Sequence, residues 1–261
     1  ADVAQYGQGD PLLNEEAYAR ATSVYLPDRA IPMLPEQLSN GICSLNPKVD
    51  RLTMTAEIDF DHDGRPGKKK FYESVIKSVE RMTYTNVKKL IDGSDAELSS
   101  RYDHILPDIK LMAELAKKLT ARRFEQGSID FDLPEPQIII DLNGKVEDIV
   151  RSERNEAHKL IEEFMLSANR AVAEEFSKRA LPFIYRIHEP PDEESVNDFA
   201  DFIATFGIRF TPGGPKSFQE ALERFDGRPE EKLINHVLLR SMKQAVYSEE
   251  NLGHFGLAFE D

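Results

Sequence analysis

The stretch Leu52-Thr-Met-Thr-Ala-Glu-Ile-Asp-Phe60 alternates apolar and polar side chains along its whole length. Because successive side chains of a strand point to opposite faces of a sheet, this alternation predicts a half-buried β-strand. Asp61-His62-Asp63-Gly64 follows with the residue types of a tight turn, and a second strand is predicted near Lys70 to Val75. This part of the chain is therefore predicted to form an antiparallel hairpin.

A second hairpin is predicted further along the chain. Two largely apolar runs, Gln137 to Leu142 and Val146 to Val150, flank the dipeptide Asn143-Gly144. Asn-Gly favours the two positive-φ positions of a type I′ turn, which joins antiparallel strands tightly. Hairpins and helices come in blocks instead of alternating, so the sequence predicts an α+β fold, rich in antiparallel pairs and packed with several long helices.

The predicted helices have apolar residues at helical spacing. They are Ile109–Leu119, Asn155–Lys178, the segment that opens at Asp192, the segment after Ser217, and Leu233–Met242. Gly127 lies where the first of these helices should stop, and Ser217 with Glu220 has the spacing of a capping box. The apolar face predicted for the long helix consists of Ala157, Ile161, Phe164, Ala168, Val172 and Phe176.

Residues 10–47 contain five prolines, at positions 11, 27, 32, 35 and 47. Each proline removes an interior hydrogen bond of a helix, so only one short helix is predicted here, from Leu12 to Ala21. The first residues, Ala1-Asp2-Val3, are predicted to be the end of a buried strand.

Composition limits the class of protein. The chain has 261 residues, 40% of them hydrophobic, and a net charge of −14. No stretch approaches the ~20 apolar residues of a membrane helix. The single cysteine, Cys43, excludes an internal disulfide and makes a reducing cytoplasm the default compartment. The negative charge argues against a general nucleic-acid-binding surface, but an enzyme that threads RNA through a narrow channel remains compatible with it.

Generic motifs give no active site. Asp61-His62-Asp63-Gly64 starts like a calcium loop, but its glycine comes too early, and a plain turn is predicted. Thr211-Pro-Gly-Gly-Pro215 lacks the Gly-Lys-Ser/Thr ending of a phosphate loop. The six histidines show no pair at metal-ligand spacing, and Cys43 is predicted to be a buried, unreactive thiol. Lys68-Lys69-Lys70 before Phe71-Tyr72 is interpreted as a solvated strand end, with contact to a nucleic acid as the alternative.

A resemblance to a known family goes further than these motifs. Residues 22–47, Thr22-Ser-Val-Tyr-Leu-Pro-Asp-Arg-Ala-Ile-Pro-Met-Leu-Pro-Glu-Gln-Leu-Ser-Asn-Gly-Ile-Cys-Ser-Leu-Asn-Pro47, resemble the signature of the RNB catalytic domain, shared by ribonuclease II, ribonuclease R and the catalytic subunit of the eukaryotic exosome. Four further blocks agree with this family in order: Ala1–Val3, Leu160–Asn169, Pro182–His188, and Tyr247-Ser248 through Gly253–Leu257. Val24-Tyr-Leu-Pro-Asp-Arg29 and His188-Glu-Pro-Pro191 are more similar to ribonuclease R than to ribonuclease II.

The resemblance implies a magnesium-dependent, sequence-nonspecific 3′-to-5′ exoribonuclease that hydrolyses RNA to nucleoside 5′-monophosphates. Magnesium would activate a water and offset charge on the scissile phosphate, held by carboxylate oxygens. In the family those aspartates cluster upstream of the position matching Ala1, and a Ser-Pro-Ile-Arg-Arg-Tyr motif with the phosphate-clamping arginine lies beyond the position matching Asp261. Neither is in this sequence, so residues 1–261 are interpreted as a single incomplete RNB catalytic domain, cut at both ends and inactive alone, with no catalytic residue and no metal ligand of its own.

The part of the family's site that remains is the RNA channel. Tyr25 matches the aromatic residue that stacks on the 3′-terminal base, and Phe131, in Ile129-Asp-Phe-Asp-Leu-Pro134, matches its partner across the stacked bases. Stacking suits an enzyme that must accept every base, because each base has a π-face. For Phe131 a core aromatic at a strand end is the alternative.

Tyr84 and Glu162 match the pair that contacts ribose hydroxyls and so prefers RNA. A carboxylate suits this role because it accepts a hydrogen bond from the 2′-hydroxyl, which DNA lacks. Glu162 also shares one stripe of the long helix with His158, Met165 and Asn169, beside the apolar face. Glu163 is instead predicted to be solvated and paired with Lys159, four residues before it.

Two alternatives from other classes stay open. One is a non-catalytic RNB-like module that binds RNA or a partner protein, and the other is a helical interaction scaffold unrelated to RNA. The scaffold requires five ordered motif matches to be accidental. Under the leading interpretation the partner is the 3′ end of single-stranded RNA, and the parent protein carries flanking oligonucleotide-binding domains.

Overall fold

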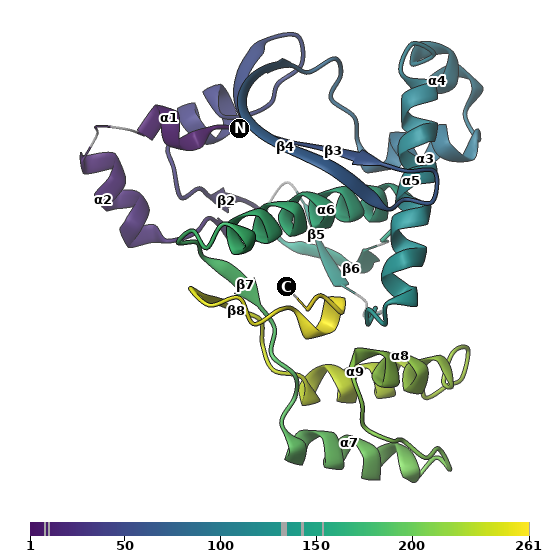
Figure 1. Cartoon of the computed structure of the whole chain (residues 1–261). Coiled ribbons are helices and arrows are strands. Elements are labelled where there is room, and N and C mark those ends of the chain that lie inside the picture. Colours follow the sequence, from purple (N-terminus) through teal and green to yellow (C-terminus); the bar gives the residue numbers. More distant parts are fainter. Residues whose placement is uncertain (8, 10, 132–134, 142–143, 153, 261) are drawn as a thin grey trace. The chain divides into compact units, whose positions relative to one another are not determined.

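The computed structural model describes residues 1–7, 9, 11–131, 135–141, 144–152 and 154–260 (Figure 1). The chain divides into two compact units. The first comprises Ala1–Asp59, Gly67–Ile109 and Pro134–His158, and the second comprises Phe60–Pro66, Lys110–Leu133 and Lys159–Asp261. Helices and paired strands occur in both, which confirms the predicted α+β class.

The described strands form two-stranded sheets. They pair as β1 (Val24–Tyr25) with β2 (Ala30–Ile31), β3 (Asp50–Phe60) with β4 (Pro66–Lys77), β5 (Glu135–Ile140) with β6 (Val146–Ser152), and β7 (Tyr185–Ile187) with β8 (Val246–Ser248). Both predicted hairpins are confirmed, and β3 and β4 are longer than predicted; Figure 1 shows them as a long, curved pair. The antiparallel β7–β8 pair joins segments far apart in the sequence, which local alternation does not reveal.

The turn of the first hairpin is closed by the side chain of Asp61. At the β3–β4 turn, Asp61 Oδ1 accepts hydrogen bonds from the backbone N–H groups of Asp63 (2.9 Å) and Arg65 (2.7 Å). These backbone donors, that of Arg65 first, lower the pKa of Asp61. The predicted plain turn is thus confirmed. The β5–β6 strands pair as far as Ile140 with Val146, while the Asn143 position of the predicted type I′ turn lies outside the described residues.

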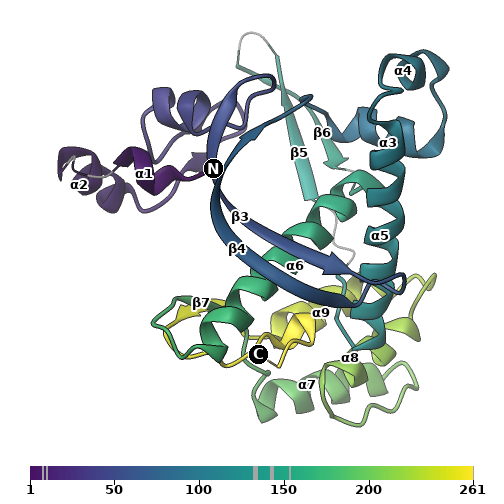
Figure 2. The same ribbon diagram turned by 45° about the horizontal axis from the view of Figure 1, so that its top comes forward.

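The first unit contains short helices and a small core. Its helices are α1 (Val3–Gly7), α2 (Pro11–Arg20), a π-helix (Gln37–Ile42), α3 (Tyr84–Asp92), α4 (Ala96–Arg101) and the first turn of α5 (Leu106–Glu125). Leu90, Tyr102 and Ile109 form the core where α3, α4 and the start of α5 meet, as Figure 2 also shows. The predicted helix at Leu12–Ala21 is confirmed as α2.

Two predictions for the first unit are wrong. Val3 opens helix α1, and residues 1 and 2 form no strand; the N–H of Asp2 donates to the carbonyl of Leu52 (2.8 Å). Cys43, predicted to be buried, is half-buried at the end of the π-helix. In both cases the apolar residues nearby in the sequence suggested burial. Burial is decided instead by which other segments of the folded chain pack against the residue.

The second unit is built around a helical core rich in aromatic side chains. Its helices are most of α5, α6 (Glu156–Lys178) after its first turn, α7 (Glu193–Ala204), α8 (Pro215–Glu223), α9 (Glu231–Ser241) and a 3-10 turn (Phe255–Leu257). Phe199, Phe218 and Phe225 are fully buried in this core, with Ile203, Ile234 and Leu238. Figure 1 shows α7, α8 and α9 grouped around it.

The helix starts of the second unit confirm one prediction and correct another. The side chain of Asp192 accepts a hydrogen bond from the N–H of Ser195 (2.8 Å), so Asp192 caps α7 as its sequence indicated. The predicted capping box at Ser217 and Glu220 is wrong, because α8 already begins at Pro215 and Ser217 donates its hydroxyl to the carbonyl of Gly214 (2.9 Å). The fixed φ of proline is preorganised for the first helical position, so helix α8 begins at Pro215 and not after Ser217.

The buried face of α6 also differs from the predicted one. Ala157, Leu160, Glu163 and Ala171 are its buried residues, whereas Ile161 is 46% exposed.

Among the described helices, none combines the length and the apolar character that a membrane-spanning helix requires.

Candidate nucleic-acid interface

Tyr25 projects from a very short strand pair. It pairs with Ala30, and the N–H of Leu26 donates to the carbonyl of Arg29 (2.8 Å), which closes the turn. The side chain is 82% exposed. The local fold therefore presents this ring to solvent, as a base-stacking residue requires.

Tyr84 begins helix α3, whose N-cap Thr83 accepts a hydrogen bond from the N–H of Asn86 (3.2 Å). Its ring stacks on His158, with the ring centroids 3.8 Å apart and the planes at 21°. The His158 Nδ1 lies 2.9 Å from the Asn155 side-chain oxygen. One face of the Tyr84 ring is thus covered, and the residue remains 46% exposed. The stack with His158 was not predicted.

Phe131 is half-buried and packs against the helical core of the second unit. The contact supports the core interpretation of this residue, while its partial exposure keeps a face available. The following residues of its motif, 132–134, lie outside the described residues.

Glu162 is half-buried on α6. The prediction that the neighbouring Glu163 is solvated and paired with Lys159 is wrong. Glu163 is 4% exposed, and its Oε1 accepts hydrogen bonds from Arg123 Nη2 (2.8 Å) and Nε (3.0 Å). Thr120 Oγ1 donates to the same oxygen (3.0 Å). The i to i+4 rule considers partners on the same helix only, whereas the partner of Glu163 comes from α5.

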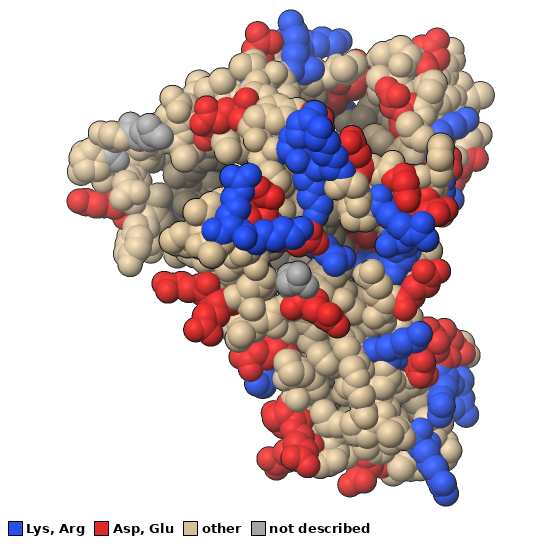
Figure 3. Space-filling view, viewed as in Figure 1, with Lys and Arg blue, Asp and Glu red and all other residues tan. Residues whose placement is uncertain are grey.

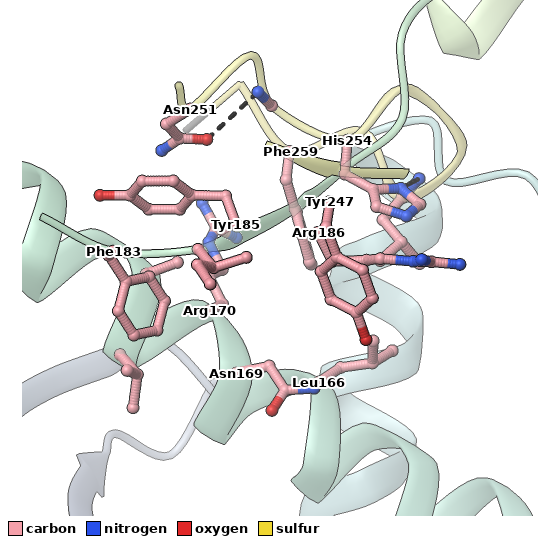
Figure 4. A pocket seen from close by; sticks show the side chains of 15 residues that line it. Leu166, Asn169, Arg170, Phe183, Tyr185, Arg186, Tyr247, Asn251, His254 and Phe259 are labelled. Atoms are coloured by element: carbon pink, nitrogen blue, oxygen red, sulfur yellow. Dashed lines mark hydrogen bonds between the residues drawn. The ribbon is translucent and has the colours of Figure 1, made fainter. Parts of the chain in front are cut away.

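Three of the sequence blocks that resemble the RNB family meet around one pocket of about 650 Å³. It is lined by residues of α6 from Leu166 to Ala173, by residues 183–186, and by residues between 247 and 259. Figure 4 shows Phe183, Tyr185, Tyr247 and Phe259 around the opening, with Asn169 of α6 on the facing side. The pocket begins one helical turn beyond Glu162. The convergence of these blocks on one pocket was not predicted from the sequence.

Guanidinium groups lie over two of the pocket's rings. The Arg170 guanidinium carbon is 4.4 Å from the centre of the Phe259 ring, and that of Arg186 is 4.8 Å from the Tyr247 ring. Asn251 Oδ1 accepts a hydrogen bond from the N–H of Gly253 (3.2 Å), drawn in Figure 4. Its buried Nδ2 has no hydrogen-bond partner among the described residues. The pocket wall thus combines aromatic faces, cations and an amide donor.

Two histidines, distant in sequence, pack edge to face beside this pocket. The ring centroids of His188 and His254 are 5.1 Å apart. His188 Nδ1 accepts from the N–H of Gly256 (3.1 Å) and its Nε2 lies 2.8 Å from the carbonyl of Lys243, so Nε2 carries the proton. Burial lowers the pKa of His188, and burial with the neighbouring His188 lowers that of His254 from 6.5 to about 4. Both rings are therefore neutral at physiological pH.

The basic run lies on an exposed strand. Lys70 Nζ is 2.6 Å from Glu57 Oε1, and the Tyr72 hydroxyl donates to Glu57 Oε2 (2.8 Å) across the hairpin. The hydrogen bond from Lys70 lowers the pKa of Glu57. Figure 3 shows Lys and Arg side chains over the β3–β4 hairpin, with acidic side chains among them. This agrees with the solvated-strand interpretation of Lys68–Tyr72, which lies within β4 and not at its end.

The described residues offer no ready set of metal ligands. Within the described part of the chain, no three His, Cys, Asp or Glu side chains gather into a group that could hold a metal ion. Magnesium needs several oxygen ligands, so the described residues do not fit this ion.

Comparisons with known proteins agree with the sequence blocks. The RNB domain family model matches residues 1–261. Ribonuclease R 1 of Lactococcus lactis is 46% identical over 265 residues, which cover 100% of this chain and 32% of that protein. Ribonuclease R of Aquifex aeolicus is 43% identical over 263 residues, covering 100% of this chain and 37% of that protein.

Solved structures share the fold. Mycoplasma genitalium RNase R, in complex with ribose-methylated single-stranded RNA, matches with a TM-score of 0.92 and 28% identity over 100% of this chain and 41% of that one. Yeast Ssd1, a pseudonuclease, matches with a TM-score of 0.74 over 97% of this chain and 31% of that one; at 17% identity it shows the fold alone.

These matches and the converging sequence blocks define an RNB-type fold. The chain belongs to the RNB domain family, and the curated relatives compared above are ribonuclease R proteins. The chain spans about a third of the length of those relatives.

Proposed function

We propose that the parent protein is a sequence-nonspecific 3′-to-5′ exoribonuclease that uses magnesium and releases nucleoside 5′-monophosphates. The observation that carries the proposal is the RNB domain match over residues 1–261. The identity of 46% to a ribonuclease R supports RNA as the substrate class, and the likeness to an RNase R structure in complex with single-stranded RNA supports a single strand. We include in the proposal a cytoplasmic location and flanking oligonucleotide-binding domains in the parent protein.

Within that enzyme, we propose that this chain is one incomplete catalytic domain that holds part of the RNA channel. Tyr25 and Phe131 would stack on bases, which contributes on the order of 1–3 kcal/mol per base without selecting a sequence. The 82% exposure of Tyr25 supports its part of this role.

Tyr84 and Glu162 would make the chain bind RNA more tightly than DNA. The Glu162 carboxylate would accept a hydrogen bond from a 2′-hydroxyl, a donor that DNA lacks. The stack of Tyr84 on His158 would hold the tyrosine in a fixed orientation, so that it loses little conformational entropy on binding.

We propose that this chain does not hydrolyse RNA by itself, because the carboxylate cluster and the arginine that the family uses are not among its residues. The test is an assay with the purified chain, magnesium and uniformly labelled RNA, so that every mononucleotide released from the 3′ end carries label. The proposal expects no mononucleotide release above a no-protein control, and release that chelation abolishes would contradict it.

The alternative is that the parent protein is a non-catalytic RNB-like module that binds RNA or a partner protein. Magnesium-dependent release of mononucleotides by the full-length parent protein would exclude this alternative. A parent protein that binds RNA without degrading it would favour it.

A further inference from the structure

One buried ion pair joins three segments of the second unit. Glu163 of α6 and Arg123 of α5 are 4% and 6% exposed. Arg123 Nη1 donates to the hydroxyl of Ser128 (2.6 Å), which is fully buried and donates in turn to the carbonyl of Gly256 (3.3 Å). The N–H of Ile129 donates to that same carbonyl (2.9 Å). The pair thus connects α6, the segment after α5 and the 3-10 turn.

The arrangement restricts the position of the Glu163 carboxylate tightly. Its Oε1 receives three hydrogen bonds, two from Arg123 and one from Thr120. A buried charge that loses its partner is strongly destabilised, so the carboxylate and the guanidinium hold each other in one geometry. Burial also protects the pair from screening by salt, in contrast to an ion pair on the surface.

This geometry determines where two of the predicted RNA contacts point. Glu162 precedes Glu163 on α6, so its side chain leaves the helix about 100° around the axis from Glu163. Holding Glu163 against Arg123 of α5 therefore contributes, together with the buried Leu160 and Ala171, to the rotation of α6 and to the direction in which Glu162 leaves the helix. Phe131 follows Ser128 by three residues, and Ser128 is held by Arg123 on one side and by Gly256 on the other.

We propose that Arg123 and Glu163 are a positioning pair that orients Glu162 toward the ribose and Phe131 toward the stacked bases. The inference rests on the proposed RNA-binding function. It assigns Glu163 a role distinct from that of Glu162: Glu163 contacts no RNA, and it sets the orientation of the residue that does.

The test compares the affinities of the purified chain for a fluorescent single-stranded RNA and for the DNA of the same sequence. The affinities are measured at a temperature well below the thermal unfolding midpoint of every variant. Glu163→Gln keeps the size of the side chain but weakens the pairing with Arg123. The proposal expects the RNA-to-DNA affinity ratio to fall by roughly tenfold, the worth of a hydrogen bond to a charged group.

Two further variants make the experiment decisive. Thr120→Val removes one donor to Glu163 while the ion pair stays, so it remains informative if Glu163→Gln does not fold; we expect a loss of roughly two- to fourfold in the ratio. Glu175→Gln is the matched control, because Glu175 lies on the same helix and pairs with Arg179 near the surface. We expect it to leave the ratio unchanged.

The possible outcomes separate this inference from the proposed function. If the unmodified chain does not prefer RNA, the proposed ribose contacts fail, and the positioning role fails with them. If the unmodified chain prefers RNA and both Glu163→Gln and Thr120→Val keep the full ratio while losing thermal stability, the pair is only structural and the positioning inference is overturned.

Discussion

At the scale of single residues, exposure alone does not identify a residue that binds RNA. Tyr25 and Tyr18 are 82% and 87% exposed, in the first unit. Only Tyr25 lies in the segment that resembles the RNB signature. The two tyrosines therefore form a natural comparison between a predicted binding residue and an equally exposed residue without that role.

We expect Tyr25→Ala to weaken binding of an RNA 3′ end by roughly 1–3 kcal/mol, or about 5- to 150-fold, because one stacking platform is lost. The melting temperature should change little, since the ring contributes little to packing. Fluorescence anisotropy and thermal unfolding measure the two quantities. Tyr18→Ala is the control and should change neither. Unchanged RNA affinity together with a large loss of stability in Tyr25→Ala would show that Tyr25 is only structural.

His254 gives the second unit a dependence on pH. Its folded pKa of about 4 lies below the usual 6.5, first because of burial, so the unfolded chain binds more protons between these values. The stabilising contribution of the neutral ring is full above pH 6.5 and is lost as the pH falls toward 4. We expect urea unfolding to give a lower free energy at pH 5 than at pH 7.

His254→Asn removes this titration while its amide oxygen can still accept the N–H of Leu257, which His254 Nδ1 accepts now. The difference in unfolding free energy between pH 7 and pH 5 should therefore shrink in this variant. The exposed His62, replaced by asparagine, is the control and should keep the original difference. An equal pH dependence in all three proteins would refute the assignment to His254.

Residue-level prediction from the sequence worked where neighbours along the chain decide the environment. Asp192 is a helix cap because its own side chain reaches the N–H of Ser195. It failed for Glu163, whose partner Arg123 lies 40 residues earlier, and the histidine pair was missed for the same reason. The one available signal was that His188 and His254 both lie in blocks that resemble the family.

At the scale of elements, the end of α5 depends on a glycine. Gly127 has a φ of +97°, and a Cβ built there would lie 2.8 Å from the backbone nitrogen of Lys216. The residue therefore combines a left-handed backbone with close approach to α8. Gly207 has a φ of +78° in the same unit, but a Cβ there would meet nothing within 4 Å.

We expect Gly127→Ala to lower the free energy of unfolding by about 2–4 kcal/mol, the sum of backbone strain and crowding. Gly207→Ala should cost only about 1–2 kcal/mol, because it adds the backbone strain alone. Urea unfolding of both variants at the same pH measures the difference. Equal losses would mean that α8 moves aside easily and that crowding at Lys216 contributes nothing.

The elements themselves were largely predictable, because hairpins and amphipathic helices are encoded by local periodicity. The β3–β4 hairpin and helices α2, α6, α7 and α9 form where their patterns predict them, although the buried face of α6 differs from the predicted one. The start of α8 was misplaced because a proline at the first helical position outweighed the capping-box spacing. The pairs β1–β2 and β7–β8 were missed, since strands of two or three residues have too few side chains to show alternation.

At the scale of the whole molecule, tertiary structure brings together what the sequence separates. Three family-like blocks line one pocket, and one buried arginine connects helix α6 with the segments around Ser128 and Gly256. Neither arrangement could be read from spacing, because each depends on how helices and loops pack. The sequence supplied the family and candidate residues, and the structure supplied their burial and their neighbours.

The measurement that tests the central claim most directly is the affinity of this chain for a short fluorescent single-stranded RNA, beside the DNA of the same sequence. The account predicts tighter binding of RNA, because Tyr84 and Glu162 would contact ribose hydroxyls that DNA lacks. Equal affinity for the two, or no binding of either, would contradict the claim that this part of the RNB domain holds a working RNA channel.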